Sequence, residues 1–189
     1  QFKYFDDSSG LADYLMHLGE NYVLKADGLM DGTSVKVAGD HLQSHHEALA
    51  YANTLFDAGQ ALLVEEKLVG EAFSLLSFTD GYHVAHMPII QADKHALAFL
   101  SPIQVQQAYE INQATIAALR QGTGQPYRGI LHGKYRLTAN GVKIIKYNAR
   151  FGDPEEVNLL ARLETDFIEL CQALIKGCLH QVDIKFKAN

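Results

Sequence analysis

Two short segments of this 189-residue sequence combine side chains that can bind phosphate and a divalent cation. Lys25 lies near the end of the apolar run 22–26, where its ammonium can meet a phosphate while its stem packs on apolar neighbours. Asn148 and Arg150 are two residues apart, so on a strand they project from one face. The amide oxygen can ligate Mg²⁺ and the guanidinium can meet a phosphoryl group. An ordinary strand-end lysine remains an alternative for Lys25.

Two further segments have both a chemical and a structural interpretation. Residues 65–68 (Glu-Glu-Lys-Leu) end an apolar run, and exposed backbone groups at a strand end suit the edge of an adenine ring. A solvated strand end is the simpler interpretation. Asp153 stands before Pro154, where it can be a helix N-cap, a site residue or both.

The first 60 residues predict a small α/β lobe that would carry Lys25. Ser8 or Ser9 is a candidate cap for a helix whose leucines recur every three or four residues up to Gly19. Ser44 and Glu47 form a capping-box pattern for a second helix that ends at Gly59. Strands are predicted at 22–26, 35–38 and 61–65.

The rest of the chain predicts mainly antiparallel strands and two long helices. Asp80-Gly81 is a tight-turn signal between strands 73–79 and 82–87, and residues 139–141 join strands 127–137 and 142–149. Ser101 and Pro102 begin a helix that ends at Gly122 and Gly124. A second long helix is predicted from Asp153 to Gly177.

Three motifs carry a resemblance to a known family: residues 24–29 (Leu-Lys-Ala-Asp-Gly-Leu), 64–71 (Val-Glu-Glu-Lys-Leu-Val-Gly-Glu) and 148–155 (Asn-Ala-Arg-Phe-Gly-Asp-Pro-Glu). In this order and spacing they resemble the ATP-grasp domain of the phosphoribosylamine–glycine ligase family, and the similarity runs through nearly all of the chain. The resemblance implies an α/β (α+β) ATP-grasp fold, with two lobes of largely antiparallel sheets that enclose a nucleotide cleft. We expect a small lobe at 1–64 and a large lobe at 65–189 that carries the metal and phosphate site.

The resemblance also implies an activity. In this family of purine biosynthesis, ATP phosphorylates the carboxylate of glycine, and phosphoribosylamine attacks the acyl phosphate to form a C–N bond. ATP and Mg²⁺ (or Mn²⁺) are the implied cofactors, and glycine and phosphoribosylamine are the implied substrates. The chain would be the middle of a longer enzyme and would need its N- and C-terminal domains to form product.

Site residues follow from the same resemblance. The implied metal ligand is Asn148, and Arg150 and Asp153 lie at the reacting end. Those implied to bind the nucleotide are Lys25, Gly32, Glu65, Glu66, Lys67, Leu68, Glu71 and Lys94.

Three departures from the family pattern fall on nucleotide or metal positions. Thr33 replaces a phosphate-binding lysine after Gly32, Ala72 replaces a glutamate expected at the ribose, and Lys146 replaces a Mg²⁺-ligating glutamate. Each lost charged contact would cost a few kcal/mol of transition-state stabilisation. A degenerate, non-catalytic nucleotide-binding domain is therefore the alternative function, and another ATP-grasp carboxylate–amine ligase is a third.

The family's glycine-rich substrate loop is missing between Lys94 and Ser101. Either the loop is deleted in this protein or residues around Ala96 are omitted from the sequence, and we expect the omission. Long loops of this kind tend to be mobile and functional.

Composition excludes several other classes. The net charge of −6 and the lack of a Lys/Arg cluster argue against nucleic acid as a partner. Apolar runs are far shorter than the roughly 20 residues of a membrane span, so we expect a cytoplasmic protein without a membrane partner. His41, His45 and His46 lack a metal-binding pattern. Cys171 and Cys178, seven residues apart in a predicted helix, are too distant for a disulfide.

Overall fold

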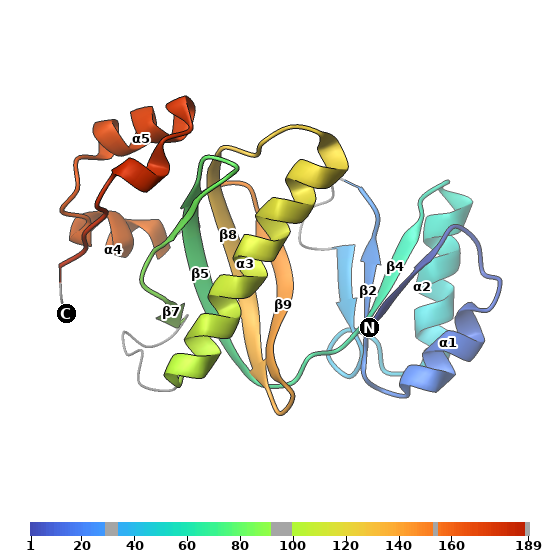
Figure 1. The fold of residues 1–189 in the computed structure, drawn as a ribbon. Coiled ribbons are helices and arrows are strands. Elements are labelled where there is room, and N and C mark those ends of the chain that lie inside the picture. The colour runs from blue at the N-terminus through green and yellow to red at the C-terminus, as the bar shows by residue number, and fades with distance from the viewer. Residues whose placement is uncertain (29–33, 92–99, 153–154, 188–189) are drawn as a thin grey trace. The chain divides into compact units, whose positions relative to one another are not determined.

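The structure is a computed structural model that describes residues 1–28, 34–91, 100–152 and 155–187 (Figure 1). The chain divides into two compact units, Gln1–Leu68 and Val69–Asn189. The division therefore falls after Leu68, whereas the lobes were predicted to divide after Val64. Within the described residues, no helix combines the length and the apolar character that a membrane span needs.

Unit 1 is a four-stranded antiparallel sheet with helices on one face. Its elements are β1 (Phe2–Phe5), α1 (Leu11–Leu18), β2 (Tyr22–Ala26), β3 (Val35–Val37), α2 (His45–Asp57) and β4 (Leu62–Glu66), and the strand order is β1-β4-β2-β3. Every second residue of β2 is buried, and Leu24, Leu62 and Val64 pack in one core with Leu11, Leu15 and Ala48 of the helices. The alternation in the sequence therefore produces one face that is covered by helices and one that is not.

The helix starts of unit 1 differ in detail from the sequence prediction. The cap of α1 is Gly10 in the left-handed conformation, so the predicted capping by Ser8 or Ser9 is wrong. Of these two serines, Ser8 contributes to the helix start only through its backbone carbonyl, which accepts a hydrogen bond from the Leu11 amide. At α2, Ser44 accepts from the Glu47 amide as predicted, but Glu47 reaches back to the amide of Gln43.

Unit 2 is built on a second antiparallel sheet. Its elements are β5 (Glu71–Thr79), β6 (Val84–His86), β7 (Ile90–Gln91), α3 (Pro102–Thr123), β8 (Gly129–Thr138), β9 (Gly141–Asn148), α4 (Glu155–Arg162), α5 (Phe167–Lys176) and the 3₁₀ helix η2 (Leu179–Gln181). The strand order is β6-β5-β8-β9, and β7 also pairs with β5. Helix α3 begins after the N-cap Ser101 and ends at Gly124, as predicted, and the structure adds a capping box between Ser101 and Gln104.

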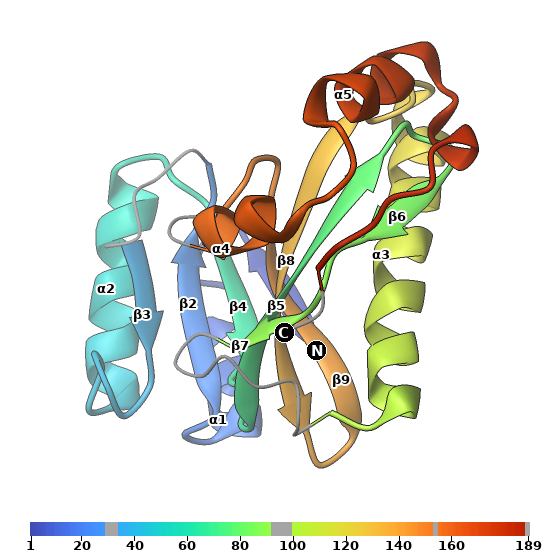
Figure 2. The same cartoon turned by 90° about the vertical axis from the view of Figure 1, so that its left-hand side faces the viewer.

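The two faces of the unit 2 sheet have separate cores. On one face, Phe73 and Leu75 of β5 pack with Tyr135 and with Ala108 of α3. On the other, β5 contributes residues to a second core with helices α4 and α5 and with η2. Figure 2 shows α4 and α5 on the side of the strands away from α3. The members of that second core are Leu76, Phe78, Met87, Leu159, Leu170, Leu174 and Leu179.

Two local predictions in unit 2 are wrong. The turn between β5 and β6 is not a tight two-residue turn, because Thr79 pairs with Val84 and the loop spans four residues. Buried Asp80 holds this loop together by accepting from the amides of Tyr82 and His83. Burial would raise the pKa of Asp80, but these and other hydrogen bonds lower it to about 2.

The second error is the single helix that was predicted to run to Gly177. The chain forms two helices, because the carboxylate of Asp166 accepts from the amides of Ile168 and Glu169 and starts α5 anew. Between the helices, the Glu164 amide donates to the Lys185 carbonyl. At this point the backbone hydrogen bond to Lys185 takes the place of a hydrogen bond within a helix.

Candidate functional site

A cationic strip lies on the face of the unit 2 sheet that α3 does not cover. Lys134 of β8 is paired with Lys146 of β9, and Arg136 with Lys143. Residues directly opposite in an antiparallel pair project to the same side, so all four cations share one face. We call Lys134, Arg136, Lys143 and Lys146 the cationic strip; an array of like charge attracts anions.

Asn148 lies at the end of this strip. It is paired with His132 and is two residues from Lys146, so the two side chains share a face, as predicted. Asn148 is half-buried and Lys146 is exposed. The same face of β5 carries Leu76 opposite His132, where the apolar core under α4 and α5 begins. This apolar core therefore borders the cationic strip at the end where Asn148 lies.

Arg150 is not on a strand, which corrects the prediction that Asn148 and Arg150 alternate on one. Strand β9 ends at Asn148, and residues 149 and 150 form a bend. The Arg150 guanidinium is exposed and donates to the carbonyl of Phe151 at 2.7 Å. Phe151 packs edge-on against Phe78, with ring centroids 6.4 Å apart. This aromatic contact fixes the segment that places Arg150 beside the end of β9.

Lys25 and Glu65 form the charged pair of unit 1. They lie on the sheet face that the helices do not cover, and Lys25 Nζ donates to Glu65 Oε2 at 2.5 Å. Their side chains are 21% and 26% exposed, so the pair is partly desolvated. Two residues predicted to bind nucleotide are thus adjacent, and the ammonium of Lys25 is held in place by a carboxylate.

The remaining residues of the predicted adenine segment are tied to unit 1. Glu66 pairs with the N-terminal ammonium at 2.9 Å, and Lys67 donates to the Ala38 carbonyl at 2.8 Å. The backbone amides of Glu66 and Lys67 donate to the carbonyls of Gln1 and Asn21. Among residues 66–68, a free backbone donor for adenine would therefore have to come from Leu68.

Three predicted residues, Gly32, Lys94 and Asp153, lie outside the described residues. Glu71 is exposed at the start of β5. Ala72, beside it, is opposite Arg136. Lys134 and Arg136 were not predicted as site residues, although polar residues at 132, 134 and 136 alternate with 131, 133 and 135. That period of two was the signal that one face of β8 is polar.

The described residues near Asn148 fit phosphate more closely than Mg²⁺. Opposite Asn148 is His132, and two residues before it is Lys146, so neither position supplies the carboxylate that Mg²⁺ favours. Cations on the strip suit the oxygens of a polyphosphate. Asn148 would contribute an amide oxygen if Mg²⁺ arrived with a nucleotide.

Two solved structures that share this fold are a ligase and a synthetase. Phosphoribosylamine–glycine ligase from Thermotoga maritima aligns with a TM-score of 0.78 and 21% identity, over 94% of this chain and 50% of that one. An N5-carboxyaminoimidazole ribonucleotide synthetase, solved as an ADP complex, aligns with a TM-score of 0.67 and 18% identity, over 99% of this chain and 48% of that one. The predicted fold class is confirmed: this is an α/β protein with the ATP-grasp fold.

Sequence comparison assigns the chain to one family among the proteins with this fold. It belongs to the family described as phosphoribosylglycinamide synthetase, ATP-grasp (A) domain, whose model matches residues 1–99 and 96–156. A phosphoribosylamine–glycine ligase from Methanococcus maripaludis is 38% identical over 208 residues, which cover 97% of this chain and 47% of the relative. This chain thus spans about half the length of the curated relatives it matches. The two matched segments meet at 96–99, where the expected loop is missing.

Proposed function

We propose that this chain is the nucleotide-binding part of a phosphoribosylamine–glycine ligase, an ATP-dependent enzyme that forms a C–N bond in purine biosynthesis. The observation that carries the proposal is the cationic strip that ends at Asn148 and Arg150, in a chain of this family. A strip of cations beside a border of apolar packing suits the triphosphate of ATP. Glycine and phosphoribosylamine are the proposed substrates, and the cytoplasm is the proposed location.

In this proposal, Lys25 of unit 1 binds a nucleotide phosphate. Its ammonium is already held by Glu65, so a phosphate oxygen would replace or share that carboxylate as the acceptor. Adenine binds against residues 65–68, with the Leu68 amide as the backbone donor and the Leu68 side chain against the ring. Glu71 is assigned to the ribose. Gly32 and Lys94 complete the proposed nucleotide set.

The reacting end of the site is assigned to Asn148, Arg150 and Asp153. Arg150 would stabilise charge on the transferring phosphoryl group, because its guanidinium is exposed beside the end of β9. Mg²⁺ (or Mn²⁺), when bound, would screen the phosphates, with Asn148 as a protein ligand. Phosphoribosylamine would be held by N- and C-terminal domains of the full-length enzyme, so we expect the 189-residue chain alone to form no glycinamide ribonucleotide.

A degenerate nucleotide-binding domain is the second candidate. The observation in its favour is Lys146, a cation on the same face as Asn148 at a position where the family has a carboxylate. This candidate and the first both require ATP binding. They differ in whether a full-length protein with this chain's residues joins glycine to phosphoribosylamine.

Calorimetry with ATP tests the shared part of both candidates. We expect Lys25→Ala to weaken ATP binding about tenfold or more, as expected for a charge-assisted phosphate contact. Lys36→Ala is the matched control, because Lys36 lies on the neighbouring strand opposite Leu24 and so on the other sheet face. A chain that does not bind ATP, or that binds it equally well without Lys25, would refute the nucleotide site.

A further inference from the structure

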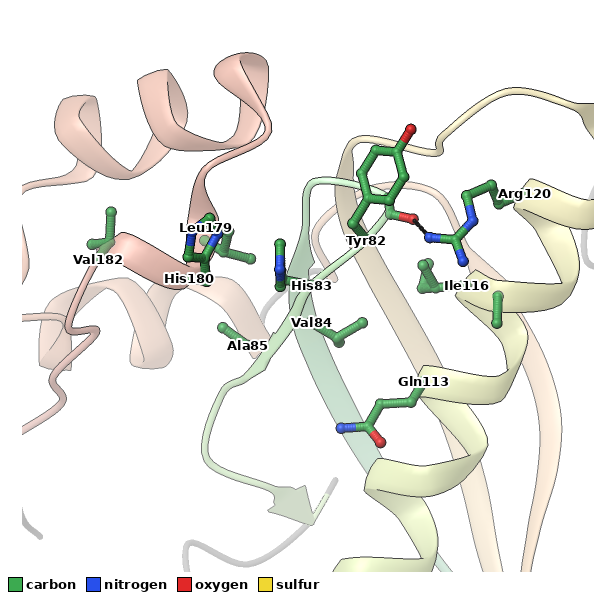
Figure 3. A pocket seen from close by; sticks show the side chains of 12 residues that line it. Tyr82, His83, Val84, Ala85, Gln113, Ile116, Arg120, Leu179, His180 and Val182 are labelled. Atoms are coloured by element: carbon green, nitrogen blue, oxygen red, sulfur yellow. Dashed lines mark hydrogen bonds between the residues drawn. The ribbon is translucent and has the colours of Figure 1, made fainter.

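Unit 2 contains a cavity that is lined by none of the residues of the cationic strip. A cavity of ≈580 Å³ lies between the β5–β6 turn, helix α3 and η2 (Figure 3). Its lining includes Tyr82, His83, Gln113, Arg120, Leu179 and His180. Two histidines from distant parts of the sequence thus reach one cavity.

Asp80 is the buried anchor beneath this cavity. Its side chain has no exposed surface. Oδ1 accepts from the amides of Tyr82 (2.9 Å) and His83 (2.7 Å), and Oδ2 accepts from the amide of Leu179 (3.0 Å) and from Nδ1 of His83 (3.0 Å). Four donors occupy the roughly four lone-pair positions of a carboxylate. Asp80 is therefore saturated and acts by orienting its neighbours.

The bond to Asp80 fixes the tautomer of His83. An ionised carboxylate has no hydrogen to donate, so it is the acceptor in its bond with His83. Nδ1 of His83 must therefore carry the hydrogen. In the neutral ring, the lone pair is then on Nε2. Metal-binding histidines show this arrangement, in which one ring nitrogen donates to a carboxylate and the other ligates the metal.

His180 of η2 supplies the second imidazole. The rings of His83 and His180 have centroids 4.4 Å apart and an interplanar angle of 41°, so they are not stacked in parallel. Ligand atoms of Asp80, His83 and His180 all lie within 4.8 Å of one another. Both histidines are exposed, and Figure 3 shows them side by side. Small side-chain rotations can therefore bring both to one ion.

We propose that His83 and His180 bind a divalent transition-metal ion of the Zn²⁺ class, with Asp80 positioning His83. Two neutral imidazoles favour Zn²⁺, Ni²⁺ or Cu²⁺, whereas Mg²⁺ prefers oxygen ligands. Water completes the coordination at this exposed site. The site is distinct from the proposed nucleotide site, since it lies on the β5–β6 turn and η2 and shares no residue with the strip.

The bound ion would join the C-terminal segment to the sheet. The Leu179 amide already donates to Asp80, and a metal held by His83 and His180 adds a second link between the same two segments. An ion that binds only the folded state raises the free energy of unfolding. Above the Kd, this increase grows with the logarithm of the ion concentration divided by the Kd. Metal binding should therefore be visible as a rise in the melting temperature.

Zn²⁺ calorimetry on the metal-free 189-residue chain tests the proposal. We expect one ion per chain, and a loss of affinity of about tenfold or more in His83→Ala and in His180→Ala. His46→Ala is the matched control, because His46 is an exposed histidine on α2. Excess Mg²⁺ should not compete. Absence of Zn²⁺ binding, or equal affinity in His180→Ala, would overturn the site.

Two further measurements separate metal binding from a folding defect. Far-ultraviolet circular dichroism of His180→Ala should match the wild type, because this side chain is exposed. Nitrogen-15 NMR of the metal-free chain should show His83 as the Nδ1–H tautomer, with the Nε2 signal shifting on addition of Zn²⁺. An Nε2–H tautomer at His83 would remove the basis of the proposal.

Discussion

The two faces of the unit 2 sheet use polar residues in opposite ways. Under α3, buried Asn112 accepts from the hydroxyls of Tyr135 and Tyr147 and donates to Ser77 Oγ at 2.8 Å. Ser77 in turn contacts His86 at 2.9 Å. On the other face, the strip aligns cations of β8 with cations of β9. One face is held together by hydrogen bonds between buried side chains, whereas the other carries the four cations of the strip, of which Arg136 donates to the Gly70 carbonyl.

This difference separates stability from binding on the same strands. In β9, Tyr147 belongs to the buried network, and its sequence neighbours Lys146 and Asn148 belong to the strip face. Changes at alternate positions should therefore affect either the free energy of unfolding or the affinity for nucleotide, and not both.

The largest expected effect is on stability, from Asn112→Ala. The change removes a buried amide, so the hydroxyls of Tyr135, Tyr147 and Ser77 lose their hydrogen bonds to it. Loss of the bonds and the new cavity should lower the free energy of unfolding by about 3–4 kcal/mol. Urea denaturation measures the change, and Gln121→Ala at an exposed site of the same helix is the control. A loss below about 1 kcal/mol would contradict the role of the network.

His86 should make stability depend on pH. Burial lowers its pKa to about 4, from an ordinary value of 6.5, because the ring is stacked on Tyr109 with centroids 4.1 Å apart. Above pH 6.5 the ring is neutral in both states and contributes no pH dependence. Between pH 6.5 and 4 the unfolded chain takes up a proton that the folded chain resists, so stability falls as the pH falls, by at most about 3 kcal/mol.

Denaturation at pH 7.5 and pH 4.5 measures this loss. His86→Phe should be less stable at pH 7.5, because it loses the bond to Ser77, but it should lose less stability on acidification. Gln121→Asn, which changes no titratable group at an exposed site, should leave the pH dependence unchanged. An equal loss in wild type and His86→Phe would show that other groups cause the acid sensitivity.

Lys146→Glu tests the strip face through binding. Without Mg²⁺, the lysine neutralises phosphate charge, so the glutamate should weaken ATP binding. With Mg²⁺, the lysine repels the ion and the glutamate can ligate it, so the variant should bind MgATP more tightly, by about 1–2 kcal/mol. Calorimetry with and without Mg²⁺ measures both. Lys143→Glu is the charge-matched comparison: it also removes a cation of the strip but is not next to Asn148, so it should weaken binding in both conditions. Wild type that binds MgATP as tightly as the variant would show that Lys146 does not intrude on the metal.

The sequence predicted those parts of the structure that local signals determine. The capped helix α3 follows from Ser101 and Gly124, and strands β8 and β9 follow from the hairpin signal at residues 139–141. The break before α5 was missed, although Asp166 is a local capping signal that starts this helix. The bond from Glu164 to Lys185 could not be predicted, because it joins residues about 20 apart. Nor could the pairing of Lys134 with Lys146, since a bulge next to Lys134 shifts the register.

The candidate site was predictable to a similar extent. The shared face of Lys146 and Asn148 followed from strand geometry alone. The end of β9 at Asn148, which takes Arg150 off the strand, depends on pairing with β8. Asn112 gave no signal, because a polar residue in a helix is usually exposed, and only the fold brings two tyrosines to it.

The smallest expected effect, in Tyr147→Phe, is the sharpest test of the comparison. The Tyr147 hydroxyl contacts Thr115 Oγ1 at 3.0 Å and donates to Asn112 Oδ1 at 3.0 Å. The variant loses the bond to Asn112 and the hydroxyl contacts with Thr115 and Tyr135. Asn112 keeps its bond from Tyr135, so we expect a loss of only about 1 kcal/mol of unfolding free energy. ATP affinity should not change, although Tyr147 lies between Lys146 and Asn148 in sequence, because its ring is on the opposite face. Urea denaturation and ATP calorimetry on the same preparation measure both quantities. A fall in ATP affinity with unchanged stability would refute the assignment of stability to the face under α3 and of nucleotide binding to the strip face.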